Sequence, residues 1–442
     1  MICALLALGS MASADDSPGR KPNIVVIVSD DAGYADFSFQ GSEQIETPRI
    51  DSIASEGVRF LQGYVSASVC SPSRAGLLTG RYQQRFGHEH NFPPSSEDHV
   101  GLPLSERTLA DALKPAGYRT IAMGKWHLGY GPELHPNERG FDEFYGFLQG
   151  ARSYRPHEGT PRNRLQHNGD FVEESFDYMT DHLGQQAARY IERFQNEPFF
   201  LYLSFNAVHT PMHALKDDLK RVRNEKNAKR KKLVAMTLAL DRAVGHVLDA
   251  LERHGLEEDT LLVFVNDNGG ATNNGSINAP LRGTKGTPFE GGIRVPYLMR
   301  WAGTLPSGRE YEPPVSTLDI FATALAAARE EKPVEKPLDG VDLIPWIAGD
   351  HEGLPHEALF WRRKRSHAVR VEDWKLVVHK REEPLLFDLS EDPAEQYDLA
   401  SEKPEVVARL QKRYRSWAGE MIDPLWNSSA KDPKEERGSQ GR

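Results

Sequence analysis

The chain has 442 residues, of which 39% are hydrophobic and 27% are charged, a composition typical of globular proteins with a large core. The formal net charge is −10 and no basic block dominates, which argues against a nucleic-acid partner because phosphate binding needs a cationic surface. No apolar run is long enough to span a bilayer, so we expect no membrane insertion.

The first residues are typical of a signal peptide. Residues 2–8 are a short apolar segment, and Ala12 to Ala14 form a small-residue cleavage site. The usual basic residues before the apolar segment are missing, and the alternative is an ordinary frayed N-terminus. We expect a signal peptide at residues 1–14 and a periplasmic or secreted protein. Because Cys3 would be removed with this peptide, Cys70 would be left without a disulfide partner in an oxidising compartment.

Residues 15–345 are predicted to form a doubly wound α/β domain. Strands buried on both faces are indicated by the apolar, β-branched runs at residues 23–28, 118–123, 199–205 and 261–265. Helical patterns lie between them, one opening at Thr47-Pro48 and one over residues 233–251. The basic run at residues 216–232 is interleaved with acids and predicts a solvated helix face. Alternating strands and helices imply helices on both faces of a parallel sheet.

A second, smaller unit is predicted at residues 346–425. Short strands are indicated at residues 359–361, 367–371, 375–378 and 386–389, with charged turns between them. A helix is indicated from Pro404 to Met421. This pattern favours a small antiparallel sheet with one helix. Residues 426–442 are polar and are predicted to be a disordered tail.

Two of the predicted buried strands end in clusters of polar side chains. The first runs into Asp30 and Asp31, and the fourth runs into Asp267 and Asn268. In an open α/β sheet the carboxyl ends of the strands meet at one edge, where ligands bind. Carboxylates brought together repel unless a cation neutralises them, and oxygen ligands favour Ca²⁺ or Mg²⁺. The alternative is that these residues only cap helices or form turns.

Cys70 begins a segment with the features of a helix N-terminus. Pro72 suits a first helical turn, so backbone N–H groups would point at Cys70 and favour an anion there. Arg74, one turn later, offers a guanidinium fork for an oxyanion. These features alone predict an activated thiolate nucleophile, whereas the alternative is a buried small hydrophobic residue.

The same segment resembles the maturation signature of type I sulfatases. It reads Cys70-x-Pro72-x-Arg74, followed by Leu77-x-Thr79-Gly80. In that family the cysteine is oxidised to formylglycine by a formylglycine-generating maturation enzyme, and the hydrated aldehyde is the nucleophile. The resemblance implies an alkaline-phosphatase-like fold, with a large mixed, mostly parallel sheet flanked by helices. It extends from about Lys21 to the region near Leu399.

Other segments match the family pattern in order along the chain. Two segments, residues 29–34 and 265–269, are similar to the family's two metal segments. Residues 124–129 and 209–211 are similar to the segments that supply a Lys and two His, and residues 282–286 are similar to the last lysine segment. Ala35, Thr284 and Pro288 depart from the pattern without removing a functional group. The resemblance implies one Ca²⁺ bound by Asp30, Asp31, modified Cys70, Asp267 and Asn268.

The resemblance also implies a mechanism with named roles. Arg74, Lys125 and Lys285 would hold the sulfate oxygens. His209 would protonate the leaving alcohol, and His127 would deprotonate the second hydroxyl so that sulfate is expelled. Taken singly, such lysines are usually surface charges and such histidines usually structural. We expect Arg294 to form a structural salt bridge near the site.

Histidines and cations in two loops suggest a polyanionic glycan as the substrate. His88 and His90 lie in the loop at residues 83–94, His213 follows the proposed acid, and residues 150–170 carry several arginines. We expect a sulfated polysaccharide or its oligosaccharides, with a lean towards a galactan, while the alternative for any one residue is a solvated loop. The competing functions are a phosphoester or phosphonate monoester hydrolase of the same superfamily and a non-catalytic protein that binds sulfated glycans.

Overall fold

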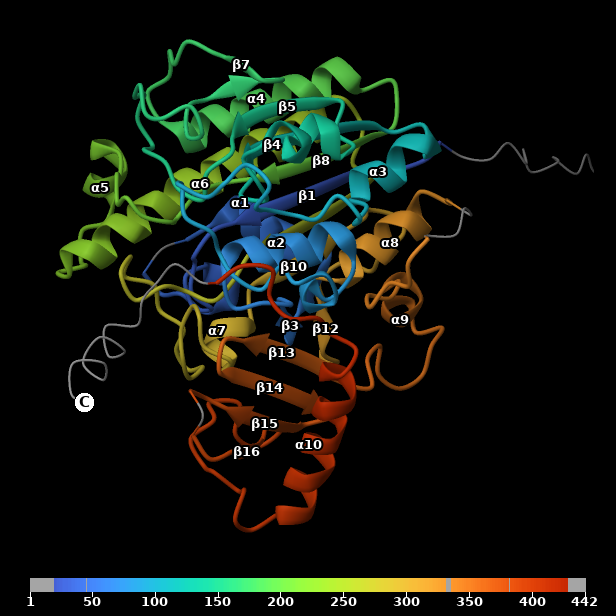
Figure 1. The fold of residues 1–442 in the computed structure, drawn as a ribbon. Coiled ribbons are helices and arrows are strands. Elements are labelled where there is room, and N and C mark those ends of the chain that lie inside the picture. Colours follow the sequence, from blue (N-terminus) through green and yellow to red (C-terminus); the bar gives the residue numbers. More distant parts are fainter. Residues whose placement is uncertain (1–19, 45, 331–334, 381, 428–442) are drawn as a thin grey trace, which may run out of the picture.

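The computed structural model describes residues 20–44, 46–330, 335–380 and 382–427. They form a large α/β lobe with a smaller lobe beneath it in Figure 1. The predicted signal peptide at residues 1–14 lies outside the described residues, as do residues 428–442 of the predicted tail. Trp426 is an exception, because its ring packs 4.7 Å from the ring of His88, so the structured chain continues past the point where we placed its end.

The described residues of the large lobe form a ten-stranded sheet in the order β11-β2-β10-β9-β1-β8-β4-β5-β6-β7. Its strands are β1 (Asn23–Ser29), β2 (Val58–Phe60), β4 (Arg119–Lys125), β5 (Glu143–Phe147), β6 (Gln166–His167), β7 (Asp170–Phe171), β8 (Phe199–Ser204), β9 (Thr260–Asn266), β10 (Tyr297–Arg300) and β11 (Arg309–Tyr311). The strands from β9 to β5 pair in parallel, whereas β10 is antiparallel to both neighbours. The expected mixed, mostly parallel sheet is confirmed. Two further strands, β3 (Gly63–Tyr64) and β12 (Val315–Ser316), form a separate parallel pair.

The central strands are buried on both faces, which explains their uninterrupted apolar sequences. Ile24, Val26 and Val28 of β1 belong to one hydrophobic core, and Val25 and Ile27 belong to the other. Successive side chains of a strand point to opposite faces, so a strand between two helical layers needs apolar residues at every position.

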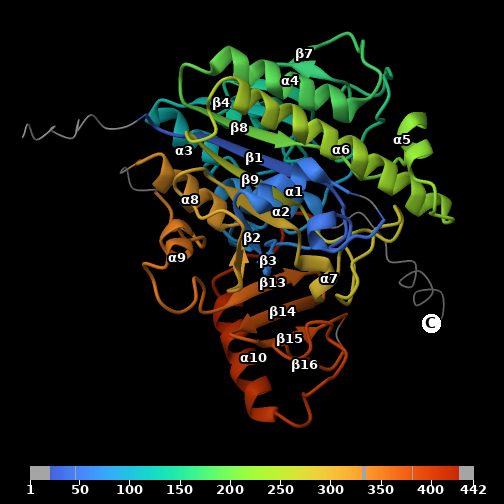
Figure 2. The same cartoon turned by 180° about the vertical axis from the view of Figure 1, so that it is seen from behind.

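Helices cover both faces of this sheet. Figures 1 and 2 show α4 (Met179–Phe194) and α6 (Ala228–Arg253) on one side of β1 and β8, and α2 (Cys70–Thr79) and α8 (Asp319–Ala327) on the other. The helices of the large lobe are α1 (Pro48–Ser55), α2 (Cys70–Thr79), α3 (Leu109–Leu113), α4 (Met179–Phe194), α5 (Lys216–Arg221), α6 (Ala228–Arg253), α7 (Glu290–Ile293), α8 (Asp319–Ala327) and α9 (Ile344–Ala348). Short 3-10 segments lie at Ser38–Gln40, Gln83–Phe86, Lys114–Ala116, Pro132–Leu134 and Pro136–Arg139. None of the described helices has the length and apolar character needed to cross a membrane.

The basic run at residues 216–232 is split rather than forming one helix face. It gives α5 and, after a break, the first turn of α6. The Asn227 side-chain oxygen accepts hydrogen bonds from the backbone N–H groups of Lys229 and Arg230, at 3.0 and 3.1 Å. This N-cap starts α6 at Ala228, five residues before the helix we predicted.

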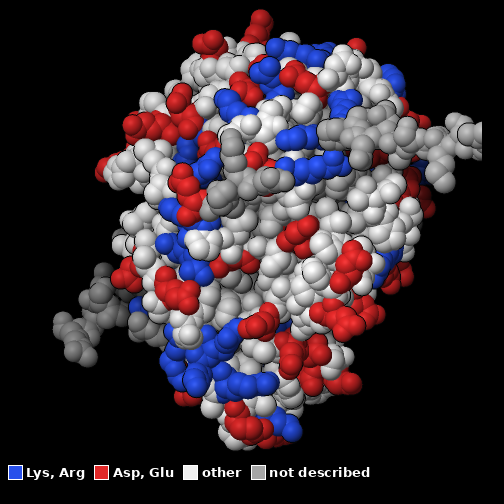
Figure 3. All heavy atoms as spheres, turned by 90° about the vertical axis from the view of Figure 1, so that its right-hand side faces the viewer, with Lys and Arg blue, Asp and Glu red and all other residues white. Residues whose placement is uncertain are grey.

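The smaller lobe contains the predicted antiparallel sheet and helix. Among the described residues it is a four-stranded sheet of β13 (Leu359–Arg363), β14 (Ser366–Val371), β15 (Trp374–Val378) and β16 (Leu385–Asp388), packed against α10 (Pro404–Ala418). The rings of Phe360 and Trp417 stack at 5.0 Å. Figure 3 shows Lys and Arg gathered on this lobe, where α10 exposes several basic side chains. The division of the chain at residues 345 and 346 stays a prediction.

A buried ion cluster joins the smaller lobe to the large one. Lys375 of β15 lies 2.7 Å from Glu290 of α7 and 2.8 Å from Glu395, and all three side chains are fully buried. Arg294 lies 3.5 Å from Glu290, which confirms the structural salt bridge that we expected. This cluster adds a buried electrostatic contact to the apolar core that the two lobes share, close to the segment that carries Lys285.

Because Glu395 shares Lys375 with a second carboxylate, we expect a pH-dependent stability. Burial raises the pKa of Glu395 from 4.5 to about 7. The folded protein then holds this proton more tightly than the unfolded chain, so the free energy of unfolding should fall as the pH rises from about 4.5 to about 7. Glu395→Gln should remove about 3 kcal/mol of this dependence. Thermal unfolding of both proteins at pH 5 and pH 8 measures it, and parallel pH profiles would contradict the assignment.

Candidate active site

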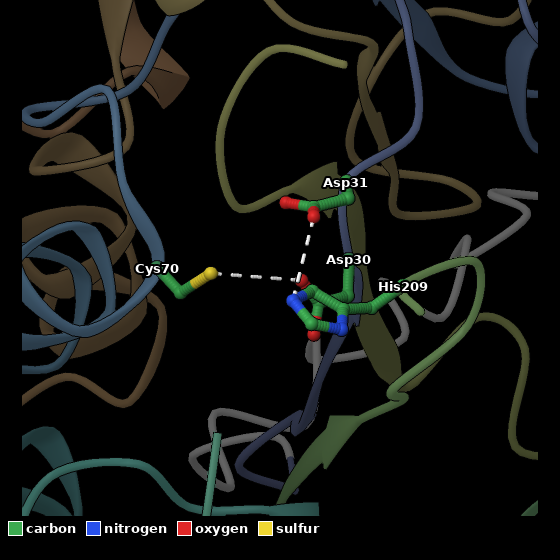
Figure 4. A group of neighbouring side chains, drawn as sticks. All are labelled: Asp30, Asp31, Cys70 and His209. Carbon is green, nitrogen blue, oxygen red and sulfur yellow. Dashed lines mark hydrogen bonds and ion pairs between the residues drawn. The ribbon is translucent and has the colours of Figure 1, made fainter. Parts of the chain in front are cut away.

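Polar side chains that follow four neighbouring strands meet at one edge of the sheet. They are Asp30 and Asp31 after β1, Asp267 and Asn268 after β9, Lys125 at the end of β4 and His209 after β8. Figure 4 shows Cys70, from α2, pointing toward Asp30 and His209. One ligand atom from each of Asp30, Asp31, Cys70 and His209 lies within 4.8 Å of the others. The convergence predicted from the strand ends is therefore present.

Cys70 is the first residue of α2, as predicted from Pro72. The preceding Val69 offers no side-chain cap, but the N–H of Ser71 donates to Asn91 Oδ1 at 2.9 Å and the N–H of Ser73 donates to the Val69 carbonyl oxygen at 3.2 Å. Cys70 is buried, and its Sγ lies 3.0 Å from Lys285 Nζ and 3.7 Å from Asp30 Oδ1. The residue thus sits between a cation and the carboxylates.

The expectation of an activated thiolate at Cys70 is wrong for this structure. Burial, followed by the charge of Asp267, raises the pKa of the Cys70 thiol to about 12. Lys125 and Lys285 act in the opposite direction but do not offset these effects. Because the thiolate is the nucleophilic form, an unmodified Cys70 would be a weak nucleophile at neutral pH.

Arg74 is fixed in orientation by groups from two strand ends. Its Nη2 lies 2.8 Å from Asp267 Oδ2 and 3.6 Å from Asp30 Oδ2, and its Nη1 donates a hydrogen bond to Ser204 Oγ. The side chain is fully buried. A rotationally fixed guanidinium beside Cys70 can stabilise negative charge on oxygen without reorganising during the reaction.

Lys125 forms a tight pair with Asp30. Its Nζ lies 2.5 Å from Asp30 Oδ2, and both side chains are fully buried. Burial alone would raise the pKa of Asp30, but neighbouring cations, led by Lys125, outweigh it and hold the pKa well below its usual range. Asp30 is therefore ionised at neutral pH.

Asp31 joins Lys285 to Asn268. Its Oδ1 accepts hydrogen bonds from Lys285 Nζ at 2.6 Å and from Asn268 Nδ2 at 2.8 Å. The side-chain oxygen of Asn268 is buried and has no hydrogen-bond partner in the described structure. An unpaired carbonyl oxygen beside three carboxylates matches the donor set of a hard divalent cation, so these residues fit Ca²⁺.

His127 is held in a confined position after β4. It has a left-handed backbone with φ 55°, and Gly150 leaves the space for its ring, because a Cβ there would lie 2.5 Å from His127 Cε1. The ring of Phe92 lies 5.4 Å away. Burial, followed by the charge of Lys125, lowers the pKa of His127 well below its usual value. His127 is therefore neutral at neutral pH and able to accept a proton.

His209 has a defined tautomer. Its Nδ1 lies 2.6 Å from the carbonyl oxygen of Thr210, and because a carbonyl only accepts, Nδ1 must carry the hydrogen. Its Nε2 lies 3.5 Å from Asp31 Oδ2. The tyrosine hydroxyl of Tyr154 donates to the backbone carbonyl of His209 at 2.8 Å and fixes this segment. The nitrogen facing the site can thus gain and release a proton.

The chain matches known families over almost all of its described length. A family model described as Sulfatase matches residues 22–330, and one described as N-sulphoglucosamine sulphohydrolase, C-terminal, matches residues 284–418. The chain belongs to the sulfatase family. It is therefore a sulfuric ester hydrolase, and the expected reaction class is confirmed.

Individual relatives of this sulfatase cover most of its length. N-acetylgalactosamine-6-sulfatase from Canis lupus familiaris is 31% identical over 93% of this chain and 87% of its own. The solved structure of Ps i-CgsB in complex with k-i-k-neocarrahexaose is 35% identical, with a TM-score of 0.89 over 95% of this chain and 97% of that one. The PsFucS1 sulfatase from Pseudoalteromonas sp. shares the fold, at 22% identity and a TM-score of 0.77 over 91% of both chains.

The three histidines expected to line the substrate cleft of the sulfatase differ in position. The expectation is wrong for His88, which is fully buried behind α2 with its Nε2 2.6 Å from Ser71 Oγ. His90 is nearly buried, and burial followed by the charge of Arg363 lowers its pKa to about 4. His213 is partly exposed, with Nδ1 3.4 Å from Ser153 Oγ.

Sequence reasoning missed two residues that shape the site of the sulfatase. Ser204, the last residue of β8, accepts from Arg74. The side-chain oxygen of Asn266 accepts from Ser29 Oγ at 2.8 Å and from the N–H of Ala32 at 3.3 Å, so it ties the end of β9 to the end of β1. In both cases the signal was a polar residue at the last position of an apolar strand, directly before or beside the metal segments.

Proposed function

We propose that this sulfatase removes sulfate from a sulfated galactan of the carrageenan type, or from its oligosaccharides, after export to the periplasm or the medium. The observation that carries this substrate is the likeness to Ps i-CgsB, solved with k-i-k-neocarrahexaose, which spans nearly the whole chain. Carrageenan is a sulfated galactan, and N-acetylgalactosamine, in the name of the dog relative, is also a sugar of the galactose series. Export rests on the sequence of residues 1–14.

Cys70 acts after oxidation to formylglycine by a maturation enzyme. The Cys70-x-Pro72-x-Arg74 motif supports this step, and so does the high pKa of the buried thiol, which would make the unmodified residue a weak nucleophile. The hydrated aldehyde offers two hydroxyl groups, whereas the unmodified cysteine offers a single, weakly acidic thiol group. One hydroxyl attacks the sulfur atom of the ester, and the other later serves to expel sulfate.

Ca²⁺ would be held by Asp30, Asp31, Asp267, Asn268 and the converted Cys70. The unpaired Oδ1 of Asn268 and the clustered carboxylates support this ligand set. His209 also lies within reach of the cluster, but a hard cation prefers oxygen ligands. When bound, the ion would neutralise charge on the sulfate and lower the pKa of the attacking hydroxyl.

Arg74, Lys125 and Lys285 bind and orient the sulfate group. Arg74 is fixed by Asp267, Lys125 by Asp30, and Lys285 reaches within 3.0 Å of the Cys70 side chain. Burial strengthens their attraction for developing negative charge, since little water screens it. Because these cations are held by carboxylates before substrate arrives, little reorganisation is needed.

His209 donates a proton in the first step of the reaction, and His127 accepts a proton in the second step. His209 carries hydrogen on Nδ1, so its Nε2 can hold the proton that the leaving sugar alcohol needs. His127 has a pKa well below its usual value and is neutral, so it can accept a proton from the second hydroxyl of the converted Cys70. Because its pKa is low, His127 is a neutral base rather than a permanent cation at neutral pH.

Removal of the cation should destabilise the protein. After chelation, the three buried carboxylates repel one another without a divalent cation to neutralise them. We therefore expect a lower Tm after chelation and full recovery of the Tm with Ca²⁺. A ligand at about 100 times its Kd stabilises the folded state by about 2.7 kcal/mol. Asp267→Asn should weaken the Ca²⁺-dependent shift in Tm, and Asp217→Asn, at an exposed carboxylate of α5, provides the matched control. A Tm that changes with neither the chelator nor Ca²⁺ would contradict the assignment of a Ca²⁺ site to these residues.

The substrate is tested by sulfate release from a panel of glycans. Protein produced with a maturation enzyme is assayed on carrageenan, fucan and glycosaminoglycan oligosaccharides. We expect release from the carrageenan series, at rates above those from the other two. Faster release from fucan or glycosaminoglycan oligosaccharides would overturn the galactan assignment while leaving sulfatase chemistry in place.

A further inference from the structure

A cation from the smaller lobe reaches the edge of the catalytic centre. Figure 1 shows β13 as the strand of that lobe nearest to α7. Arg363 is the last residue of β13, and its Nη1 lies 3.2 Å from the carbonyl oxygen of Gly286. Gly286 directly follows Lys285, whose Nζ contacts Cys70 Sγ. The guanidinium therefore lies one residue away from the catalytic lysine.

The contact between Arg363 and Gly286 lies beside the backbone that leads into Cys70. The N–H of Gly286 donates to the carbonyl oxygen of Ser68 at 2.7 Å, two residues before Cys70. Gly286 has φ +87°, and a Cβ placed on it would lie 3.4 Å from Arg363 Nη1 and 4.0 Å from Val69. Glycine at this position leaves the guanidinium beside a small hollow that Ser68, Gly286 and Arg363 help to line.

Among the described residues, Arg363 has no acidic partner, unlike the other cations of the site. Arg74 and Lys125 are paired with Asp267 and Asp30, and the adjacent Arg362 is paired with Glu89 at 3.1 Å. Within the described ranges, no carboxylate pairs with Arg363, and its Nε is buried without a hydrogen-bond partner. A guanidinium has five N–H donors, so most of those of Arg363 remain unused.

Two further cations, Arg362 and Lys364, lie near Arg363, and Arg362 is already paired with Glu89. The charges of Arg363 and of these two neighbours act on His90, which lies on the same side of the site. A buried or half-buried cation without a counter-ion is costly unless a ligand supplies the negative charge. The fork of a guanidinium matches a sulfate or carboxylate in a bidentate manner.

We propose that Arg363 binds a second anionic group, a further sulfate ester, on the same glycan whose sulfate is removed at Cys70. This inference rests on the proposed function, since it places a second sulfate beside the one that reacts. Arg363 is then a specificity-determining residue that selects multiply sulfated sugars.

The large groove beside α4 and α6 does not fit such a substrate. Its lining carries six carboxylate side chains and four Lys or Arg side chains. The excess of negative charge would repel a polyanionic chain. The hollow at Arg363 has the opposite balance, with two Arg side chains in its lining, and the Gly286 that helps to line it directly follows Lys285.

The test compares two galactose-series oligosaccharides of equal length, one with a single sulfate and one with a second sulfate on the neighbouring sugar. For Arg363→Gln we expect KM on the disulfated substrate to rise about 10- to 100-fold, which is the loss of one hydrogen-bonded charge contact, with kcat within about 2-fold. KM on the monosulfated substrate should stay within about 2-fold. Arg363→Lys should recover part of the loss. Arg409→Gln, at an exposed cation of α10, is the matched control and should change neither constant.

Equal losses on both substrates, or none on either, would overturn the proposal. A second measurement separates it from the proposed function. Calorimetric binding of the disulfated oligosaccharide to Cys70→Ala protein, which has no nucleophile at this position, with and without Arg363→Gln, needs no turnover. Weaker binding only when Arg363 is replaced supports the anion subsite even if no sulfate is released. Unchanged binding contradicts it whatever the activity.

Discussion

Replacing Cys70 by Ser is expected to abolish sulfate turnover in protein that folds normally. A serine at this position can offer one hydroxyl for attack on sulfur, but it lacks the second hydroxyl from which His127 would take a proton to expel sulfate. Any sulfate transferred to the serine should therefore remain attached. Initial rates of sulfate release measure the loss, and the intact mass of the variant after incubation with substrate would show the trapped ester.

The matched control for this variant lies in the same helix turn. Ser73→Ala changes a buried residue of α2 that occupies an unfixed position of the Cys-x-Pro-x-Arg motif, so it should keep both maturation and activity. Multiple turnovers by Cys70→Ser protein would contradict the formylglycine assignment, because no aldehyde hydrate could then be needed.

The second large effect is expected for Lys125→Ala. Lys125 is fully buried at the end of a central strand, and its Nζ lies 2.5 Å from Asp30 Oδ2. We assign Lys125 a direct contact to a sulfate oxygen of the substrate. Removing one such preorganised donor costs about 2.7–4 kcal/mol of transition-state stabilisation, or roughly a 100- to 1,000-fold loss in kcat. Steady-state kinetics on one sulfated oligosaccharide measure it.

Loss of Lys125 also leaves Asp30 without its nearest cation, so a structural effect must be separated from a catalytic one. Lys412→Ala, on the exposed face of α10, controls for the loss of a lysine, and the Tm of both variants reports on folding. Full turnover by a correctly folded Lys125→Ala variant would show that Lys125 has no part in catalysis.

The position of the site was predictable because it follows from topology. Apolar runs that are buried on both faces imply parallel strands, and parallel strands bring their carboxyl ends to one edge. Asp30, Asp31, Asp267 and Asn268 could therefore be placed together from the sequence. The helix start at Cys70 followed from Pro72 in the same way, because the signal is local.

Properties set by contacts between distant segments were not predictable. The thiol of Cys70 was expected to be acidic from its helix position, but burial and the charge of Asp267, contributed from β9, raise its pKa instead. His88 was expected in the cleft, yet Trp426 from the far end of the chain packs against its ring. Arg363 gave no signal as a residue of the site, because only the docking of β13 brings it to Gly286.

Sulfate ester chemistry at Cys70 is tested by the release of sulfate and of phosphate from a matched pair of aryl esters, using one preparation in which mass spectrometry has shown Cys70 as formylglycine. We expect sulfate release that depends on Ca²⁺ and is lost in Cys70→Ser protein, with phosphate release far slower. Fully converted protein that releases phosphate but no sulfate would contradict it.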